Sequence, residues 1–227
     1  MKKVVVLLLA VALIPASLFA VDGQVLINQS TLNAAGGTYT ITQAGSYKLS
    51  GNLQVKDADT TPIVVSADNV TIDLNGFTIG GANVCGLTCR FTSAQNGIDS
   101  VFGINLTVTN GTINGMGQFG IHAEGLGMRI DSVTVSNNGF DGMRVGSGLI
   151  DKCRVLRNGR WGISTTSEGG SVQRSFIDQN KLFGMVLGPQ WGYFQNNLQN
   201  NNGLFNPQVS GFGLNLGQNQ CAGAACP

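Results

Sequence analysis

The only histidine of the sequence, His122, belongs to a set of residues that could act together on a substrate. Asp99, His122 and Arg144 each stand two positions after a recurring glycine, 23 and 22 residues apart. If each interval is one turn of a repeated structure, the three side chains share an outward column, because adjacent strands lie about 4.8 Å apart. Arg144 could then neutralise the carboxylate of a uronic acid while His122 or Asp99 moves the α-proton. The alternative is a solvated polar stripe, in which a surface ion pair contributes about 0–1 kcal/mol. The same spacing continues the column through Ser164, Val186 and Asn215.

A second outward column contains two neighbouring aspartates, Asp131 and Asp151. Its other members are Asp73, Thr109, Gln173 and Gln195. Hard cations bind clustered oxygen ligands, so the two carboxylates are a candidate Ca²⁺ site. The alternative is that Arg129 and Lys152, which are close in sequence, neutralise them at the surface. No other cofactor is expected.

Aromatic and basic side chains are candidates for contacts with sugars. Trp191 and Tyr193 lie in the segment GPQWGYF, which we expect to be a loop that exposes both rings. Lys152 and Arg174 belong to a group of eight basic residues between positions 129 and 181, where there are five acidic residues. This small excess attracts anionic glycans or lipid head groups weakly, and a mixed solvated face is the alternative.

Aromatic residues also stand directly before recurring glycines. They are Phe119, Trp161, Phe183 and Phe212. Counted from the inward-facing isoleucines that follow the glycines, these positions face inward, so we expect an interior aromatic stack. A platform for sugars would require the rings to turn outward.

The five cysteines are consistent with export. Cys85 and Cys89 are four residues apart, and Cys221 and Cys226 are five apart, so each pair could close a small disulfide loop in an oxidising compartment. A metal site at Cys85 and Cys89 is the alternative, but no histidine or third cysteine nearby completes a tetrahedron. Cys153 alternates with apolar residues and is predicted to be a buried thiol.

Three sets of residues recur with a common period of about 20–24 residues. They are the glycines 97, 120, 142, 162, 184 and 213, the asparagines 114, 138, 158, 180 and 202, and the apolar residues Ile130, Ile150, Val172 and Phe194. Short alternating runs between them are typical of strands with one buried face. Stacked turns bury a continuous apolar column and pair each strand with the next, and repeated asparagines can form a hydrogen-bonded ladder. The sequence therefore predicts an all-β parallel β-helix of about seven turns.

The segment IVVSADNVTIDLNGFTIGG (63–81) and later repeats such as GIHAEG and GMRVGS resemble the right-handed parallel β-helix repeat proteins of the pectin-lyase-like group. The resemblance covers roughly residues 36–216 and implies a single-stranded right-handed β-solenoid. This fold occurs in lyases, hydrolases, epimerases, adhesins and non-enzymatic surface proteins, so it does not select a function. The Arg-x-Pro motif of pectate lyases, the Gly-His-Gly motif of polygalacturonases and the Asp-Pro-His motif of alginate epimerases are absent from the sequence.

Residues 1–20 have the layout of a secretory signal peptide. Lys2 and Lys3 precede an apolar run over 4–14, and small residues end at Ala20. An uncleaved anchor is the alternative, but the run is shorter than the about 20 residues that span a bilayer. We expect capping strands over 21–62, β-helix coils over 63–216 and a cysteine-containing tail over 217–227. The exported chain would be secreted, periplasmic or at the cell surface, with no transmembrane segment after cleavage.

Composition excludes several classes of protein. Charged residues are 11% of the chain, against about 25% in typical soluble domains. The formal net charge of +1 and the lack of a basic run argue against nucleic-acid binding. We expect an exported, non-catalytic β-solenoid that binds a polysaccharide or cell-surface glycan or has a structural role. The alternative is a lyase, hydrolase or epimerase that acts on a uronate-containing glycan.

Overall fold

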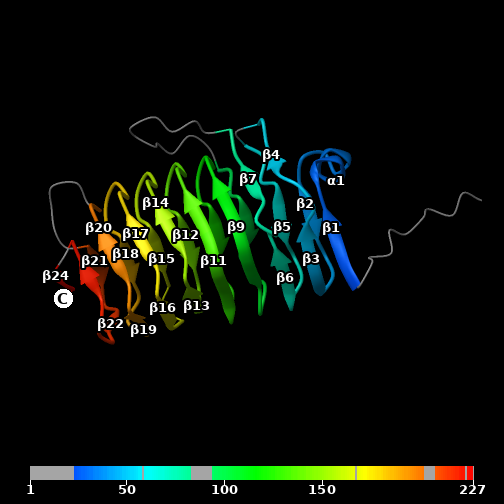
Figure 1. The fold of residues 1–227 in the computed structure, drawn as a ribbon. Helices are drawn as coiled ribbons and strands as arrows, with labels where there is room; N and C mark the ends of the chain where they lie inside the picture. The colour runs from blue at the N-terminus through cyan, green and yellow to red at the C-terminus, as the bar shows by residue number, and fades with distance from the viewer. Residues whose placement is uncertain are drawn as a thin grey trace, which may run out of the picture.

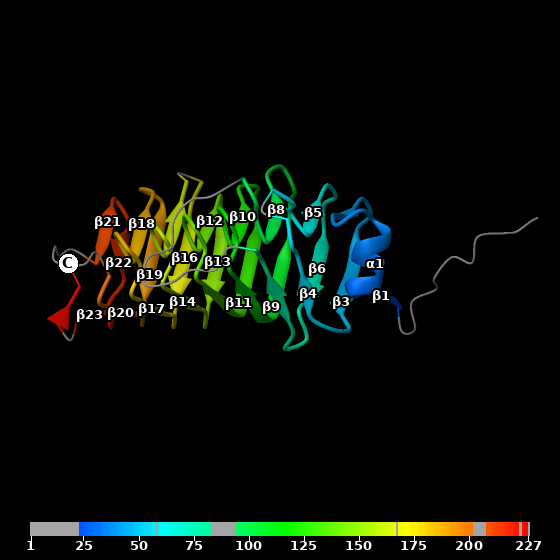
Figure 2. The ribbon, with the colours of Figure 1, turned by 90° about the horizontal axis from the view of Figure 1, so that it is seen from above.

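The computed structural model describes residues 23–57, 59–82, 94–166, 168–201, 208–222 and 224–226. The predicted signal peptide and the predicted disulfide between Cys85 and Cys89 lie outside these residues. Within them the chain forms a parallel β-solenoid of eight turns, which confirms the predicted fold and adds one turn to the about seven expected. Figure 1 shows the turns stacked from β1 at the right to β21 and β24 at the left, and Figure 2 shows the same stack from above.

One side of every turn belongs to a sheet of eight parallel strands, each three residues long. In order across the sheet they are β2 (Tyr39–Ile41), β5 (Ile63–Val65), β8 (Ile98–Ser100), β10 (Ile121–Ala123), β12 (Met143–Val145), β15 (Ile163–Thr165), β18 (Met185–Leu187) and β21 (Val209–Gly211). Successive side chains of a strand point to opposite faces. The middle residue of each strand therefore points outward, and its neighbours point into the solenoid.

The remaining strands form a sixteen-stranded sheet with two arms. The first arm contains β1 (Gln24–Ile27), β3 (Gly45–Leu49), β6 (Val70–Asp73), β13 (Gly148–Asp151), β16 (Gly170–Gln173), β19 (Trp191–Phe194) and β22 (Leu214–Asn215). The second arm contains β4 (Leu53–Gln54), β7 (Thr78–Gly80), β14 (Arg154–Leu156), β17 (Phe176–Asp178), β20 (Asn197–Gln199), β23 (Gln220–Cys221) and β24 (Ala224–Ala225). β9 (Thr107–Asn114) and β11 (Met128–Ser136) run through both arms. Where the arms meet, the chain turns through residues with a positive φ, such as Ser132 (58°), Lys152 (52°) and Arg174 (46°).

Stacked apolar side chains fill the interior. Ile130, Ile150 and Val172 are in register and at most 1% exposed. Their partner in the next turn is Tyr193, and not the predicted Phe194. That turn is one residue shorter than predicted, since the equivalents Val172 and Tyr193 are 21 residues apart. A shift of one residue moves every side chain of a strand to the other face.

This shift overturns the prediction for Trp191 and Tyr193. Both lie in strand β19, and not in a loop, and both point into the core, where each is 1% exposed. Burial raises the pKa of the Tyr193 phenol. The same shift replaces Gln195 by Phe194 in the aspartate column, because Gln173 is in register with Phe194.

A column of buried asparagines connects consecutive turns at one corner. Its members are Asn138, Asn158, Asn180 and Asn201, each at most 2% exposed. The Oδ1 atom of Asn158 accepts hydrogen bonds from the backbone N–H of Asn138 (3.1 Å) and from its Nδ2 (2.9 Å), and the pattern repeats up the column. Gln208 ends it by accepting two hydrogen bonds from Asn201. The structure thus contains the predicted ladder, with Asn201 in place of Asn202 and without Asn114.

The recurring glycines stand beside this ladder. A Cβ atom on Gly142 would lie 2.7 Å from Nδ2 of Asn158 and 2.6 Å from Cγ1 of Val155, closer than real Cβ atoms approach. Gly213 does not belong to the series. The strand that follows β18 is β21, in which Ser210 pairs with Val186. Asn215 therefore lies outside the outward column for which it was predicted.

The aromatic residues before the glycines do not form the expected interior stack. Phe119 is buried, with 4% of its surface exposed, whereas Trp161 and Phe183 are half-buried and Phe212 is 80% exposed. Phe212 precedes Gly213, so it shares the displacement of that segment. Trp161 instead contacts an arginine at the surface, as described below.

The two ends of the solenoid are closed by different elements. At the N-terminal end, helix α1 (Gln29–Ala34) packs Leu32 against the core, and the side chain of Asn28 caps the helix by accepting hydrogen bonds from the backbone N–H groups of Ser30 and Thr31. At the C-terminal end, β23 and β24 form an antiparallel pair. In the described ranges, no helix has the length and hydrophobicity needed to span a membrane.

The cysteines of the described residues agree with the predictions. Cys221 and Cys226 form a disulfide that fastens β24 to β23, and both are in the core cluster. Cys153 is a free thiol that is 1% exposed and contacts the carbonyl oxygen of Asp151 at 3.2 Å. Burial raises the pKa of the Cys153 thiol to about 12, so it stays protonated at neutral pH.

Candidate functional site

Asp99, His122 and Arg144 lie side by side on the outer face of the eight-stranded sheet, as the spacing predicts. They are the middle residues of β8, β10 and β12 and are in direct register. Nδ1 of His122 lies 2.7 Å from Oδ1 of Asp99, which also accepts a hydrogen bond from Nδ2 of Asn96 at 3.0 Å. An ionised carboxylate only accepts hydrogen bonds, so this contact places a proton on Nδ1 of the imidazole.

Glu124 completes this group, and sequence reasoning missed it. Its Oε2 atom lies 3.5 Å from Nε2 of His122, and its Oε1 atom accepts a hydrogen bond from Nε of Arg144. The link between His122 and Arg144 therefore runs through Glu124. The sequence contains one signal that could have predicted this role of Glu124. It stands two residues after His122, which keeps its side chain on the same face of the sheet beyond the end of β10.

Phe119 fixes the plane of the imidazole from beneath. The two rings are stacked, with centroids 4.9 Å apart and an angle of 22° between their planes. Phe119 in turn contacts Phe140 edge to face, at 5.5 Å between centroids. Because Phe119 is buried, His122 has an aromatic support on one side and partial exposure (16% of its side chain) on the other.

A second charged group adjoins the first along the same face. Asp141 is completely buried and accepts two hydrogen bonds from Arg160, at 2.6 Å from Nε and 2.6 Å from Nη2. It also accepts a hydrogen bond at 2.8 Å from the hydroxyl of Ser164, the residue that follows Arg144 in the outward column. The guanidinium carbon of Arg160 lies 3.6 Å from the ring centroids of both Phe140 and Trp161. Such contacts stabilise a cation through the electron-rich ring face.

Together these residues form a continuous group along one side of the solenoid, which we call the histidine face; Asp141, Ser164 and Phe119 lie beneath its surface. It consists of Asp99, His122, Glu124, Asp141, Arg144, Arg160 and Ser164, with the aromatic residues Phe119, Phe140 and Trp161. Along this face, hydrogen-bonding side chains alternate with aromatic rings. Each of the hydrogen-bonding groups is held in place by a neighbour. Two of its carboxylates, those of Asp99 and Glu124, are partly exposed, and the third, that of Asp141, is buried.

The two aspartates of the predicted Ca²⁺ site are neighbours, but each is bound to a cation of the protein. Asp131 accepts hydrogen bonds from the Ser132 hydroxyl (2.7 Å) and from Arg129 (2.6 Å), and these contacts lower the pKa of its carboxyl group. Asp151 is buried and receives both Nε and Nη2 of Arg174, the first at 2.8 Å. Among the described residues, no group of three or more His, Cys, Asp or Glu side chains is placed to hold a metal ion.

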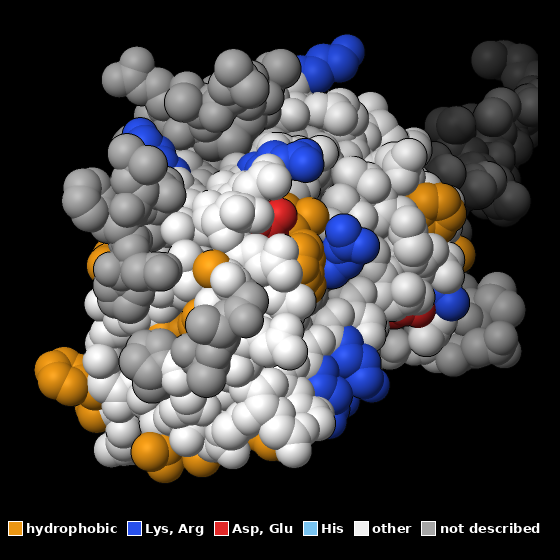
Figure 3. Space-filling model, turned by 60° about the vertical axis from the view of Figure 1, so that its left-hand side comes forward, with side chains coloured by type: hydrophobic (Ala, Val, Ile, Leu, Met, Phe, Trp, Pro, Cys, Tyr) orange, Lys and Arg blue, Asp and Glu red, His pale blue; other side chains and the backbone are white. Residues whose placement is uncertain are grey.

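The four predicted sugar contacts do not share a surface. Trp191 and Tyr193 are inside the solenoid, whereas Lys152 and Arg174 are exposed at the corner between the two arms of the larger sheet. The Lys152 ammonium is 4.0 Å from the Asp151 carboxylate. The hydrogen bonds to Asp151 raise the pKa of the Arg174 guanidinium. Figure 3 shows Lys and Arg side chains in a broken row on this view of the molecule.

Beside Asp99 the surface is hollowed into a cavity of about 300 Å³. Its lining includes Asp99 itself, Ser66, Asp68 and the side chain of Phe102, which is 91% exposed. The cavity extends the histidine face toward the N-terminal turns. A ligand that follows the outward column could therefore end in it.

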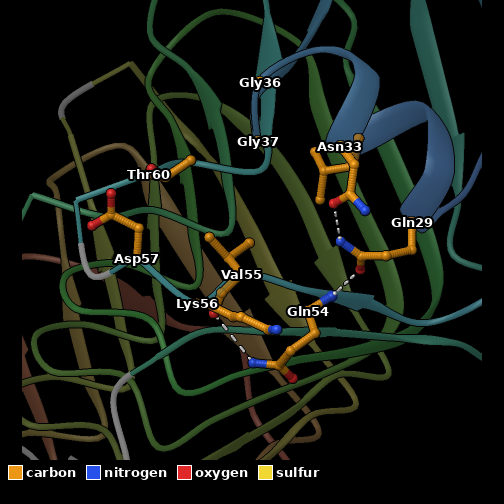
Figure 4. Close-up of a pocket in the computed structure, with 10 residues that line it drawn as sticks. Gln29, Asn33, Gly36, Gly37, Gln54, Val55, Lys56, Asp57 and Thr60 are labelled. Atoms are coloured by element: carbon orange, nitrogen blue, oxygen red, sulfur yellow. Dashed lines mark hydrogen bonds between the residues drawn. The ribbon is translucent and has the colours of Figure 1, made fainter.

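A larger cavity of about 440 Å³ lies at the N-terminal end, between α1 and the segment around Lys56 and Asp57 (Figure 4). Gln29, Asn33 and Gln54 lie along its wall and are joined by hydrogen bonds, one of which comes from the backbone of Gln54. Gln29 donates to Oδ1 of Asn33 at 2.9 Å and accepts from the backbone N–H of Gln54 at 2.7 Å. The Gln54 carboxamide donates to the carbonyl oxygen of Gly81 at 3.1 Å. Sequence reasoning missed this cavity, because its residues belong to no repeated column.

A scan of protein-family models, a search of curated proteins and a search of solved structures each find no match to this chain.

Proposed function

We propose that this protein is an exported, non-catalytic β-solenoid that binds a glycan along the histidine face. The observation that carries the proposal is the continuity of this face. Over three consecutive turns it presents Asp99, His122 and Arg144 in register, beside the half-buried rings of Phe140 and Trp161. Regularly spaced hydrogen-bonding groups beside aromatic rings suit an extended chain of hydroxyl-bearing units.

The pairing of the charged groups supports binding over turnover. Arg144 is bonded to Glu124, so it is not free to neutralise the carboxylate of a uronic acid. Nε2 of His122, the nitrogen that would remove a proton, faces the Glu124 carboxylate at 3.5 Å. A substrate would have to displace these contacts before reaching either group. The ion pairs hold His122, Glu124 and Arg144 in fixed positions, which suits binding of a ligand.

The balance of charge favours a neutral glycan. At its surface the histidine face carries the carboxylates of Asp99 and Glu124 beside the guanidinium groups of Arg144 and Arg160, while Asp141 is buried beneath them. An acidic polysaccharide would therefore meet like charge as well as unlike charge. Hydroxyl groups, in contrast, both donate to carboxylates and accept from guanidinium groups.

A second candidate function rests on the contact between Asp99 and His122. A carboxylate at 2.7 Å that orients an imidazole is the geometry of a general base. With this pair the protein would act as a polysaccharide lyase or epimerase of the pectin-lyase-like group on a uronate-containing glycan.

One experiment separates the two functions. The purified protein is screened for binding to neutral and acidic polysaccharides, and release of unsaturated uronate is followed by absorbance with and without Ca²⁺. We expect binding to a neutral glycan, no turnover, and loss of binding in Arg144→Ala and Trp161→Ala. Arg154→Ala is the matched control, since this exposed arginine lies on the larger sheet against Phe176. Turnover that His122→Ala abolishes would establish the enzyme instead, and absence of binding to every glycan would refute the proposal.

Export is part of the proposal and has its own test. The layout of residues 1–20 supports it, as does the disulfide between Cys221 and Cys226, because disulfides persist in oxidising compartments. We expect the N-terminus of the protein recovered outside the cytoplasm to be Val21. Recovery of the chain in the cytoplasm with Met1 retained would contradict export.

A further inference from the structure

The cavity beside Asp99 carries negative charge. It has a volume of about 300 Å³ and lies where the chain leaves β5 and β8, two strands that pair with each other and stand side by side in Figure 2. Of the described residues that line it, Asp68 and Asp99 are acidic and none is Lys, Arg or His. A cavity walled by charge of one sign concentrates ions of the other sign, so this one attracts cations.

Each of the two carboxylates keeps one oxygen for a ligand. Oδ1 of Asp68 accepts a hydrogen bond from the backbone N–H of Ile104 at 2.8 Å. Oδ1 of Asp99 receives both contacts of that side chain, from Asn96 and His122. Within the described part of the chain, neither Oδ2 atom takes part in a hydrogen bond or an ion pair. An ionised carboxylate has about four acceptor positions, so both side chains can accept N–H groups of one cation.

Phe102 adds an aromatic ring to the same lining. It is 91% exposed, more than any other large apolar side chain in the described ranges. A ring face attracts a cation that lies within about 6 Å of its centroid, and it also packs against apolar C–H groups. An exposed ring next to two carboxylates therefore suits a cation that is attached to a ring or a short carbon chain.

A buried hydroxyl next to the lining is left unpaired. Oγ of Ser100, a residue that is 1% exposed, has no hydrogen-bond partner among the described residues. It adjoins Gly103 of the lining, because a Cβ atom on this glycine would lie 2.6 Å from it. An unsatisfied buried hydroxyl costs free energy that a hydrogen bond from a ligand recovers. Ser100 is thus a polar group, independent of the two carboxylates, that indicates a ligand here.

We propose that this cavity binds the protonated primary amine of an amino sugar. The three N–H donors of an ammonium group match the free oxygens of Asp68 and Asp99, and the sugar ring lies against Phe102. The choice of a sugar rests on the proposed function, because Asp99 belongs both to the cavity and to the outward column. The amino sugar is then the end unit of a glycan that is otherwise neutral. A volume near the lower end for ligand cavities suits one such unit.

The test compares glucosamine with glucose and N-acetylglucosamine in NMR titrations of the purified protein at constant ionic strength. The three sugars share one ring, and only glucosamine carries an ammonium group. We expect glucosamine to bind at least about ten-fold more tightly than the other two. Butylamine, which has the ammonium group without the sugar ring, should bind more weakly than glucosamine.

Two variants remove the groups that recognise the amine. Asp68→Asn removes the charge but keeps an acceptor for the Ile104 backbone N–H, so the protein stays folded and the dissociation constant for glucosamine should rise about ten-fold. Phe102→Ala should raise it about three-fold, and this side chain is too exposed for its loss to unfold the protein. Asp59→Asn and Phe212→Ala are the matched controls. They make the same changes at exposed positions outside the cavity and should leave binding of glucosamine unchanged.

Several results would overturn the proposal. They are equal affinity for the three sugars, binding of glucosamine that survives both Asp68→Asn and Phe102→Ala, and displacement of glucosamine by Ca²⁺, which would indicate a metal site. Butylamine that binds as tightly as glucosamine would overturn the assignment to a sugar. Failure of the proposed function gives a different result. In that case no polysaccharide binds, whereas binding of glucosamine that depends on Asp68 would still support the cavity site.

Discussion

The buried asparagine ladder and the outward column of the histidine face both run along this solenoid, and the same stacking produces both. In the buried ladder, Asn138, Asn158 and their successors are neutral and identical, and each bonds to the next. In the outward column of the histidine face, Asp99, His122 and Arg144 differ in charge, and 16–39% of each side chain is exposed. Register alone therefore does not decide whether a column is structural or chemical. Burial and the identity of the neighbours decide it.

The difference follows from the cost of burying polar groups. A buried amide is stable only if its donors and acceptors are satisfied, which a stack of asparagines achieves without any charge. A stack of charged groups needs unlike neighbours, and it retains part of its hydration when one side faces water. Of the two columns, the ladder should therefore contribute more to stability than the histidine face. Four variants test this division.

The largest loss should come from Asn158→Ala in the middle of the ladder. The substitution removes the acceptor of both the backbone N–H and the Nδ2 group of Asn138 and leaves these two buried donors without it, whereas Oδ1 of Asn180 keeps the hydrogen bond from the backbone N–H of residue 158. Unsatisfied buried groups cost about 1–3 kcal/mol each, so the free energy of unfolding should fall by about 3 kcal/mol in urea titrations. Asn33→Ala, at an exposed position in α1, is the control and should change it by less than about 0.5 kcal/mol. Equal effects of the two variants would mean that the ladder is not a source of stability.

Asp141→Asn tests the one buried charge within the histidine face. Asn keeps the shape but loses the ion pair with Arg160, whose guanidinium remains over Phe140 and Trp161. Breaking a fully buried pair costs about 3–5 kcal/mol, and the partial exposure of Arg160 reduces this to about 2 kcal/mol. Thermal or urea unfolding measures the change, with Asp59→Asn at an exposed position as the control. An unchanged midpoint of unfolding would mean that Asp141 contributes as little to stability as the exposed column does, and not as much as the ladder.

The sequence alone predicts the fold and part of the histidine face, for a physical reason. Asp99, His122 and Arg144 follow glycines that recur because a side chain there would collide with core and backbone atoms of the adjoining turns, and at Gly120 and Gly142 also with the asparagine ladder. Their spacing therefore reports the register directly. None of the other described turns has an acidic residue at the position equivalent to Glu124. Its contact with Arg144 also depends on the conformation of its side chain, which periodicity does not predict. The sequence predicts Trp191 and Tyr193 in an exposed loop, whereas both lie in β19 and face the core, because this turn is one residue shorter than its neighbours and periodicity does not reveal that until the register is known.

His122→Ala should cost far less than either buried substitution. Asp99 keeps its hydrogen bond from Asn96, and Glu124 keeps Arg144, so no carboxylate loses its last partner. We expect the free energy of unfolding to fall by about 1 kcal/mol or less in urea, mainly through the lost contact with Phe119. Binding of a glycan should weaken in the same variant. A loss of stability as large as that of Asn158→Ala would show that the outward column is structural after all.

The smallest effect concerns Asp131, whose dependence on pH distinguishes a charged column from the neutral ladder. The hydrogen bond from Ser132, followed by that from Arg129, lowers the pKa of this carboxyl group below its ordinary value of 3.8. A group with a lowered pKa in the folded state stabilises the fold at pH values above its ordinary pKa, and the contribution disappears as the pH falls through the lowered value. Stability should therefore decline from about pH 5 downward, and it should decline less steeply in Asp131→Asn, measured by urea unfolding at several pH values. Asn158→Ala should keep the pH dependence of the unaltered protein, since the ladder does not titrate. Parallel curves for Asp131→Asn and the unaltered protein would mean that the contacts of Asp131 add nothing to stability.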